Sequence, residues 1–387
     1  RWHENFHLGY RVKSTGLRIW PNEPGGQNGC DDCEQYQVHS HASGLILTVP
    51  GVATGGQFLL QSGNLSYIFR KIKLNQREAD LKTSSVLPKH LSASVIAVPP
   101  LALDNALKPD MEQNRRIISH LHSGGVTSYL YGGNANFFAL PISDYGLVLD
   151  ILEDIAPDDC WMIPSIGADY GKALDQVQVL KSRQFPTAML LPMQAPVTPE
   201  GVATGVRRLS DLYGKQLIVY VKYEGYLTPG LLRKLLADGV VCSIKYAIER
   251  ADPGDDNFLA ELVDQVGTER LVSGIGERPV TVHLGRFGLS GFTSGSVCIA
   301  PSLSMAFLKA VKSGDLAQAG TLWQKFVPLE DLRDAHSPIR VLHEAVRLAG
   351  IADTGPMMPL LNNIDSPALC ADIELAANNL LSANQSL

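Results

Sequence analysis

The nine residues from Val240 to Ile248 read Val-Val-Cys-Ser-Ile-Lys-Tyr-Ala-Ile. The run is β-prone, and turn-forming or charged residues bound it on both sides. An apolar run of this length is typical of a strand that is buried on both faces, as the strands of parallel sheets are. The stretch therefore predicts a parallel sheet that carries one charged side chain, Lys245, in its interior.

Lys245 is the candidate reactive group of this strand. Burial strongly disfavours an ammonium group, so the pKa of Lys245 should fall until part of the side chain is a neutral amine near pH 7. A neutral amine is a nucleophile whose natural partner is a carbonyl carbon. The alternative is a structural lysine that extends to solvent from the strand end or pairs with an acid.

The composition of the 387-residue chain is that of an ordinary globular protein, with 45% hydrophobic and 19% charged residues. The formal net charge of −6 argues against a general role in binding nucleic acid. No apolar stretch reaches the ~20 residues that a membrane-spanning helix needs. Six cysteines in so long a chain do not indicate a disulfide scaffold, so a reducing, cytoplasmic location is expected.

Residues 1–91 differ from the rest of the chain. They are rich in Gly, Asn, Gln and Ser and contain few periodic segments, although residues 44–50 could form a strand and residues 59–72 a second element. We expect an N-terminal extension that is disordered or loosely attached.

The same extension contains four residues of the types that bind zinc, namely Cys30, Cys33, His39 and His41. The separation between the cysteine pair and the histidine pair is far shorter than in a zinc finger. Solvated loop residues are therefore the favoured interpretation, and no metal is expected.

From residue 92 the pattern becomes regular, and apolar strand-like runs alternate with amphipathic helical runs. The predicted strands are residues 94–99, 126–131, 160–166, 187–192, 216–221, 240–246, 270–275 and 289–294. The predicted helices between them are residues 109–122, 144–155, 171–184, 199–213, 228–238, 256–266 and 279–287. Eight such repeats predict a (β/α)8 TIM barrel over residues 92–300, followed by a helical region over residues 301–387. A doubly wound sheet is disfavoured, because no Gly-rich dinucleotide turn follows the first strand.

The functional groups of a TIM barrel lie at the carboxyl ends of its strands. Glycine-rich segments follow the second, seventh and eighth predicted strands, at residues 132–136, 273–277 and 293–296. Successive backbone amides of such segments can form a concavity that binds an anion, or the glycines can simply permit tight turns. No phosphate-binding loop or nucleotide fingerprint occurs, so no cofactor is expected.

The order and spacing of these motifs resemble the dihydrodipicolinate synthase / N-acetylneuraminate lyase family of Schiff-base-forming barrels. The resemblance covers residues 92–365 and rests on the Gly-rich turn after strand two, Tyr220 on strand five, Lys245 on strand six, Ser273-Gly274 on strand seven and Gly291 to Gly295 on strand eight. It implies an enzyme that forms an imine between the strand-six lysine and a 2-oxo acid such as pyruvate, and a homo-oligomer, dimer or tetramer.

The resemblance also implies roles for individual residues. Lys245 would be the nucleophile and Tyr220 the acid and base. Gly132, Gly133 and Asn134 would hold the substrate carboxylate through backbone amides. The further candidate substrate-binding residues are Gly274 and Ser294, at the ends of strands seven and eight.

The alternation of side chains along a strand makes Lys222 a further candidate substrate-binding residue. It follows Tyr220 by two positions, so both side chains should point into the barrel. There, Lys222 could bind a substrate carboxylate or lower the pKa of Lys245 by repulsion between like charges. The alternative is a solvated lysine at the end of a strand.

Three departures from the family pattern affect the predicted chemistry. The usual strand-two turn is Gly-Thr-Thr-Gly-Glu, whereas residues 132–136 read Gly-Gly-Asn-Ala-Asn and lack the hydroxyl that relays protons to the tyrosine. The tyrosine that follows strand four in the synthases is replaced by Met193, and the arginine that follows the strand-five tyrosine is absent. These departures argue against lysine biosynthesis but leave the imine chemistry intact.

Three functions fit this set of residues. The leading prediction is a Schiff-base lyase or synthase that breaks or forms a C–C bond in a 2-oxo acid or a sugar-acid derivative. The second is a dehydratase that uses the same imine. The third is a non-catalytic paralogue that binds a metabolite, since one fold hosts many functions.

Overall fold

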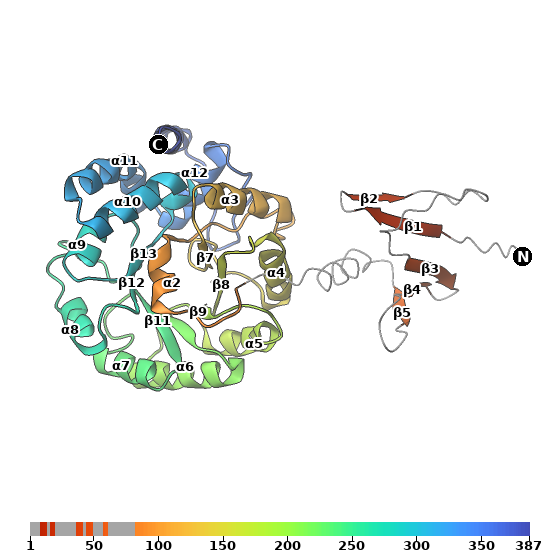
Figure 1. Ribbon diagram of the computed structural model, residues 1–387, viewed down its shortest axis with the longest axis horizontal. Coiled ribbons are helices and arrows are strands. Elements are labelled where there is room, and N and C mark those ends of the chain that lie inside the picture. Colours follow the sequence, from red (N-terminus) through yellow and green to blue (C-terminus); the bar gives the residue numbers. More distant parts are fainter. Residues whose placement is uncertain (1–7, 14–15, 20–35, 42–43, 49–56, 61–81) are drawn as a thin grey trace, which may run out of the picture. The chain divides into compact units, whose positions relative to one another are not determined.

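The computed structural model describes residues 82–387 in full, together with the strand backbones at residues 8–13, 16–19, 36–41, 44–48 and 57–60. The chain divides into two compact units, Arg1–Ala79 and Asp80–Leu387 (Figure 1). No helix in the described part of the chain is both long and apolar enough to span a membrane.

The first unit contains a five-stranded antiparallel sheet in the order β2-β1-β3-β4-β5. Its strands are β1 (Leu8–Lys13), β2 (Gly16–Ile19), β3 (Tyr36–His41), β4 (Gly44–Thr48) and β5 (Gln57–Leu60). Strand β4 lies within the strand expected over residues 44–50. Of the four possible zinc ligands, His39 and His41 lie on β3, and the two cysteines lie outside the described residues.

The second unit is a closed barrel of eight parallel strands, as predicted. The strands are β6 (Ile96–Ala97), β7 (Ser128–Tyr131), β8 (Trp161–Ile166), β9 (Ala188–Leu190), β10 (Leu217–Val221), β11 (Val241–Tyr246), β12 (Leu271–Ser273) and β13 (Gly291–Ser294). Each of these strands lies within one of the eight predicted ranges, so the sequence-based TIM barrel is confirmed.

Helices lie between successive strands and surround the barrel (Figure 1). They are α3 (Met111–Ser123), α4 (Ile142–Ile155), α5 (Tyr170–Leu180), α6 (Pro199–Tyr213), α7 (Pro229–Ala237), α8 (Asn257–Val266) and α9 (Val280–Gly285). Helices α6 and α7 begin as their sequences predict. The side chains of Thr198 and Thr228 accept hydrogen bonds from the first-turn amides of Gly201 and Leu231, and proline occupies the next position.

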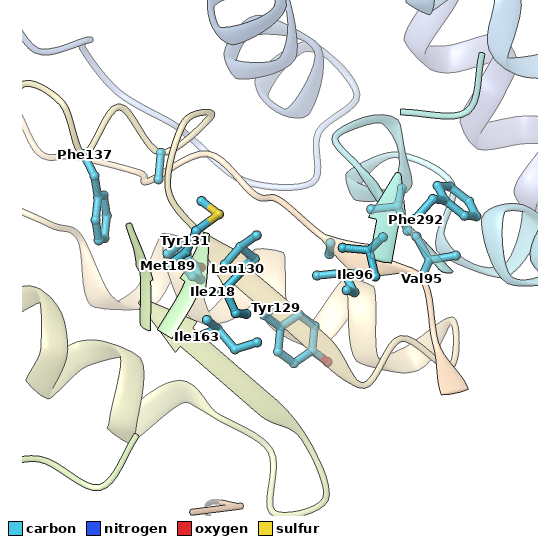
Figure 2. Close-up of a cluster of buried hydrophobic side chains, with 14 of the residues drawn as sticks. Val95, Ile96, Tyr129, Leu130, Tyr131, Phe137, Ile163, Met189, Ile218 and Phe292 are labelled. Atoms are coloured by element: carbon cyan, nitrogen blue, oxygen red, sulfur yellow. The ribbon is translucent and has the colours of Figure 1, made fainter. Parts of the chain in front are cut away.

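The barrel interior is filled by apolar side chains from neighbouring strands. Leu130 lies opposite Ile163 in the β7–β8 pair, and Met189 lies opposite Ile218 in the β9–β10 pair. Figure 2 shows these four side chains gathered against one another. Because successive residues of a strand alternate between its two faces, the residues between them point out toward the helices.

The predicted helical region after strand eight is also present. It comprises the short helix η1 (Ser296–Cys298) and helices α10 (Pro301–Ser313), α11 (Leu316–Ala335), α12 (Pro338–Leu348) and α13 (Pro367–Gln385). Helix α11 contacts α10, α12, α13 and η1. The contact with η1 brings α11 to the carboxyl end of the last barrel strand. At the opposite end of the barrel, helix α2 (Pro88–Ala93) packs against β13.

Candidate active site

Lys245 lies inside the barrel, with only 4% of its surface exposed. Its neighbour Tyr246 points outward, where its ring stacks on Phe258 at the start of α8, so alternation directs Lys245 inward. No carboxylate in the described part of the chain forms an ion pair with its Nζ. Burial lowers the pKa of Lys245 to about 7, with smaller contributions from the charges of Lys222 and Arg333. A large fraction of this amine is therefore neutral near pH 7.

Tyr220 lies beside Lys245 on the adjacent strand. The two residues are register partners in the β10–β11 pair, and Nζ of Lys245 lies 4.1 Å from the centroid of the Tyr220 ring. Burial raises the pKa of Tyr220 well above its ordinary value, and the charge of Glu249 adds to the shift. The phenol therefore keeps its proton near neutral pH and can serve as an acid.

Gly274 makes room for the Lys245 side chain. A Cβ on Gly274 would lie 2.9 Å from both Cγ and Cε of Lys245, and 2.8 Å from Cβ of Ala247. Real Cβ contacts do not approach this closely, so any larger residue would displace the lysine. The structure therefore brings together three of the predicted residues, Lys245, Tyr220 and Gly274.

The turn after β7 is the segment predicted to bind the substrate carboxylate. Hydrogen bonds from the Asn136 amide to the Gly133 carbonyl (2.9 Å) and from the Phe137 amide to the Gly132 carbonyl (3.1 Å) hold it. The amides of Gly133 and Asn134 donate to no residue that the structure describes. A Cβ on Gly132 would lie 2.6 Å from Oγ of Ser165, so only glycine fits there. The carboxylate-binding role of this turn stays a prediction.

Two other predicted residues form polar contacts with groups other than Lys245. Lys222 follows the last residue of β10, is about two-fifths exposed and forms an ion pair with Glu249. Ser294 is buried, donates to Oε1 of Glu277 at 2.5 Å and accepts from the Val297 amide at 2.9 Å. Their roles as substrate contacts stay predictions.

The sequence interpretation missed two polar residues of this region. Ser165 on β8 is fully buried, and its hydroxyl has no hydrogen-bond partner among the described residues. Arg333 on α11 is 7% exposed and forms a 2.6 Å ion pair with Glu330. No motif marks either residue, because Ser165 is one small residue in a buried strand and the leucines around Arg333 favour a packing role.

Glu277, the last residue of the Gly-rich segment after strand seven, is completely buried. Its Oε1 accepts hydrogen bonds from Ser294 and from Ser304 of α10, and its Oε2 has no partner among the residues described. Burial raises the pKa of Glu277 to about 8, and the nearby charge of Glu330 contributes. This carboxyl group is therefore largely neutral at pH 7.

One group of three described residues could supply metal ligands, namely His122, Asp159 and Cys160, whose ligand atoms lie within 4.8 Å of one another. The group lies at the amino ends of the strands, away from Lys245. Burial raises the pKa of the Cys160 thiol to about 12, which disfavours the thiolate form that zinc binds.

Comparisons with known proteins bear on the fold of the barrel. No family model matches the chain. A curated relative, the probable 5-dehydro-4-deoxyglucarate dehydratase 1 of Streptomyces avermitilis, is 24% identical over 273 residues, which cover 67% of this chain and 84% of that protein. A prophage protein of E. coli K12 from the dihydrodipicolinic acid synthase family, solved with pyruvate, matches 74% of this chain and 98% of its own with a TM-score of 0.64 and 18% identity. The barrel has the fold of the dihydrodipicolinate synthase family.

A second solved structure has the same fold. A Ruminococcus gnavus sialic acid aldolase, solved as a mutant of its catalytic lysine, matches 78% of this chain and 99% of its own with a TM-score of 0.68 and 13% identity. The resemblance stated from the sequence is therefore confirmed, and the proteins that the chain resembles are enzymes.

Proposed function

We propose that the protein is a Schiff-base-forming lyase that acts on a 2-oxo acid, either pyruvate or a sugar-acid derivative. One observation carries the proposal: a buried lysine with a pKa of about 7 lies against the ring of a tyrosine on the adjacent strand. Structural ion pairs also perturb pKa values, but no ion pair of Lys245 occurs among the described residues. An amine that is neutral, buried and free of a carboxylate partner is suited to attack a carbonyl carbon.

The chemistry follows from the two side chains. The Lys245 nitrogen bonds to the carbonyl carbon of the 2-oxo acid, and the carbonyl oxygen leaves as water after it takes up protons. The Tyr220 hydroxyl, which is protonated near neutral pH, can supply one of these protons because its ring lies against the Lys245 amine. Along the carbon chain from the imine carbon, the first C–C bond stays intact and the second one breaks. The resulting iminium ion accepts the electron pair of that second bond. That bond breaks when the hydroxyl group on its far carbon loses its proton, which yields an enamine and an aldehyde.

A dehydratase is the second candidate, and the 24% identity to the Streptomyces avermitilis protein favours it. The same iminium ion acidifies the C–H bond next to the imine carbon. Loss of that proton and departure of a hydroxyl group from the following carbon as water gives an unsaturated product. The two reactions share Lys245 and differ in which bond breaks after the imine has formed. A cytoplasmic location and assembly as a dimer or tetramer belong to this proposal as expectations from the sequence.

Borohydride trapping tests the shared step. The protein is incubated with pyruvate or another 2-oxo acid, and sodium borohydride then reduces any imine to a stable secondary amine. We expect one adduct per chain, which peptide mass spectrometry assigns to Lys245. Lys245→Ala and Lys245→Arg should give no adduct and remain folded. Tyr220→Phe keeps the ring beside Nζ but should slow adduct formation by ~10²–10⁴-fold, as is typical for loss of an acid–base group.

Two results would count against the mechanism. An adduct at Lys222 in place of Lys245 would move the nucleophile to the exposed end of β10. No adduct with any member of a panel of 2-oxo acids would favour the non-catalytic metabolite-binding protein.

A further inference from the structure

Arg333 places a guanidinium group at the carboxyl end of the last barrel strand. The residue belongs to α11, far along the chain from the barrel strands, and is 7% exposed. Its Nη1 donates to Oε1 of Glu330 at 2.6 Å and lies 3.4 Å from Oγ of Ser296. Its Nη2 donates to no acceptor among the residues that the structure describes. This nitrogen is not one of the fully buried polar atoms that lack a partner, so the protein does not enclose it completely. One side of the guanidinium is thus fixed in place while the other keeps free donors.

The free side faces the turn after β7. A Cβ on Gly295 would lie 2.7 Å from Nη2 of Arg333 and 2.8 Å from Nδ2 of Asn134, so both nitrogen atoms approach the same point. Nδ2 of Asn134 donates one hydrogen bond, to the Val98 carbonyl at 2.9 Å, which leaves its second hydrogen available. Two donors from distant parts of the chain therefore converge beside Gly295, where the lack of a side chain permits their close approach.

The Arg333–Glu330 pair carries no net charge, so the free Nη2 hydrogens of Arg333, and not an excess of positive charge, would hold an anion here. Glu330 neutralises one positive charge, and the neighbouring carboxyl group of Glu277 is largely neutral because burial raises its pKa. A Cβ on Gly276 would lie 2.8 Å from Oε2 of Glu330, and a Cβ on Gly274 would lie 2.9 Å from Cε of Lys245. The Arg333–Glu330 pair and the Lys245 amine therefore border the same segment after β12. The planar fork of an arginine matches the two oxygens of a carboxylate.

We propose that Arg333, together with Asn134, binds the carboxylate group next to the reacting carbonyl of a 2-oxo acid. The inference rests on the proposed imine chemistry of Lys245 and adds a residue from the C-terminal helices to the barrel site. It also adds a donor beside the strand-two turn. Residues 132–136 lack the threonine hydroxyls of the related enzymes, and here Arg333 supplies a charged donor beside that turn.

The test compares pyruvate with its neutral methyl ester in borohydride trapping at Lys245. The trapping rate constant of each compound is measured at low concentration, and the ratio of the two is the carboxylate preference. Comparing this ratio between variants cancels the different intrinsic reactivities of acid and ester. We expect Arg333→Met to lower the ratio by roughly 10–100-fold, as expected for loss of charge-assisted hydrogen bonds. Arg333→Lys should retain part of the preference.

Two further variants make the result interpretable. Arg333→Met leaves Glu330 buried without its partner, so the double variant Arg333→Met/Glu330→Gln removes that orphaned charge and should show the same loss of preference. Arg347 is a matched control, because it forms an i,i+3 ion pair of 2.6 Å with the buried Glu344 on the neighbouring helix α12. Arg347→Met should leave the ratio unchanged.

The outcomes separate this inference from the proposed function. A lower ratio in both Arg333→Met variants, with the ratio of Arg347→Met unchanged, supports carboxylate binding by Arg333. An unchanged ratio in the Arg333 variants, or equal slowing with acid and ester, would show that Arg333 only supports the fold. No adduct at Lys245 in the parent protein with either compound would overturn the imine chemistry and this inference with it.

Discussion

Lys245 destabilises the folded protein in the same environment that makes it reactive. Burial lowers its pKa to about 7, whereas a lysine in an unfolded chain titrates near ~10.4. Between these two pKa values the unfolded chain binds more protons than the folded one, so the free energy of unfolding rises with pH over that window. The destabilisation by the buried ammonium group is fully present below about pH 7. Each unit of difference between the folded and unfolded pKa values corresponds to ~1.4 kcal/mol.

Lys245→Met should therefore stabilise the protein, because methionine has a similar unbranched shape and no charge. We expect the free energy of unfolding to rise by roughly 3–5 kcal/mol at about pH 6, with the gain shrinking as pH approaches about 10. Urea unfolding of the parent and the variant across that range measures the gain. Lys222→Met is the matched control, since Lys222 is partly exposed and paired, and its effect should be small. A gain independent of pH would contradict a depressed lysine pKa.

At the scale of elements, the sequence predicts the repeated strands and helices of the barrel. It does not predict contacts that depend on how distant helices pack. Each barrel strand is a short apolar run followed by a helix, so its position follows from local pattern. That the strands of Tyr220 and Lys245 are neighbours follows as well, because the strands of a barrel pair in chain order, whereas the register that makes these two residues partners does not. The approach of Arg333 to Asn134 depends instead on how α11 packs on η1, and no local pattern of α11 encodes that contact.

The packing of β11 against β12 leads to a test at the same scale. Gly274→Ala would put a methyl group 2.9 Å from Cε of Lys245, so the lysine must move while both strands stay paired. A displacement near 1 Å can cost ~10²-fold in rate, so adduct formation at Lys245 should slow by roughly that factor. The same methyl group would lie 2.8 Å from Cβ of Ala247, so the melting temperature should also fall. Gly320→Ala on α11, where a Cβ meets nothing within 4 Å, is the control. Parental trapping rates in Gly274→Ala would show that the amine does not depend on this space.

On the scale of the whole molecule, the two compact units raise the question of where the barrel begins. The sequence pattern becomes regular at residue 92, whereas the second unit starts at Asp80. Val86 and Leu91 belong to the buried core, and α2 packs against β13. The backbone carbonyl of Leu91 would lie 2.5 Å from a Cβ on Gly291, so the chain before the first barrel strand fits closely against the last one.

A pair of shortened chains tests this boundary. A chain that begins at Lys82 keeps every described residue of the second unit, and we expect it to melt within a few degrees of the parent. A chain that begins at Leu91 loses Val86 and the first three residues of α2. Burial of one valine side chain contributes ~1.5–3 kcal/mol, so this shorter chain should melt several degrees lower. Differential scanning calorimetry of both chains and of the parent measures these melting temperatures. Equal melting would favour a boundary at residue 91, and aggregation of the chain from Lys82 would show that the barrel needs the first unit in order to fold.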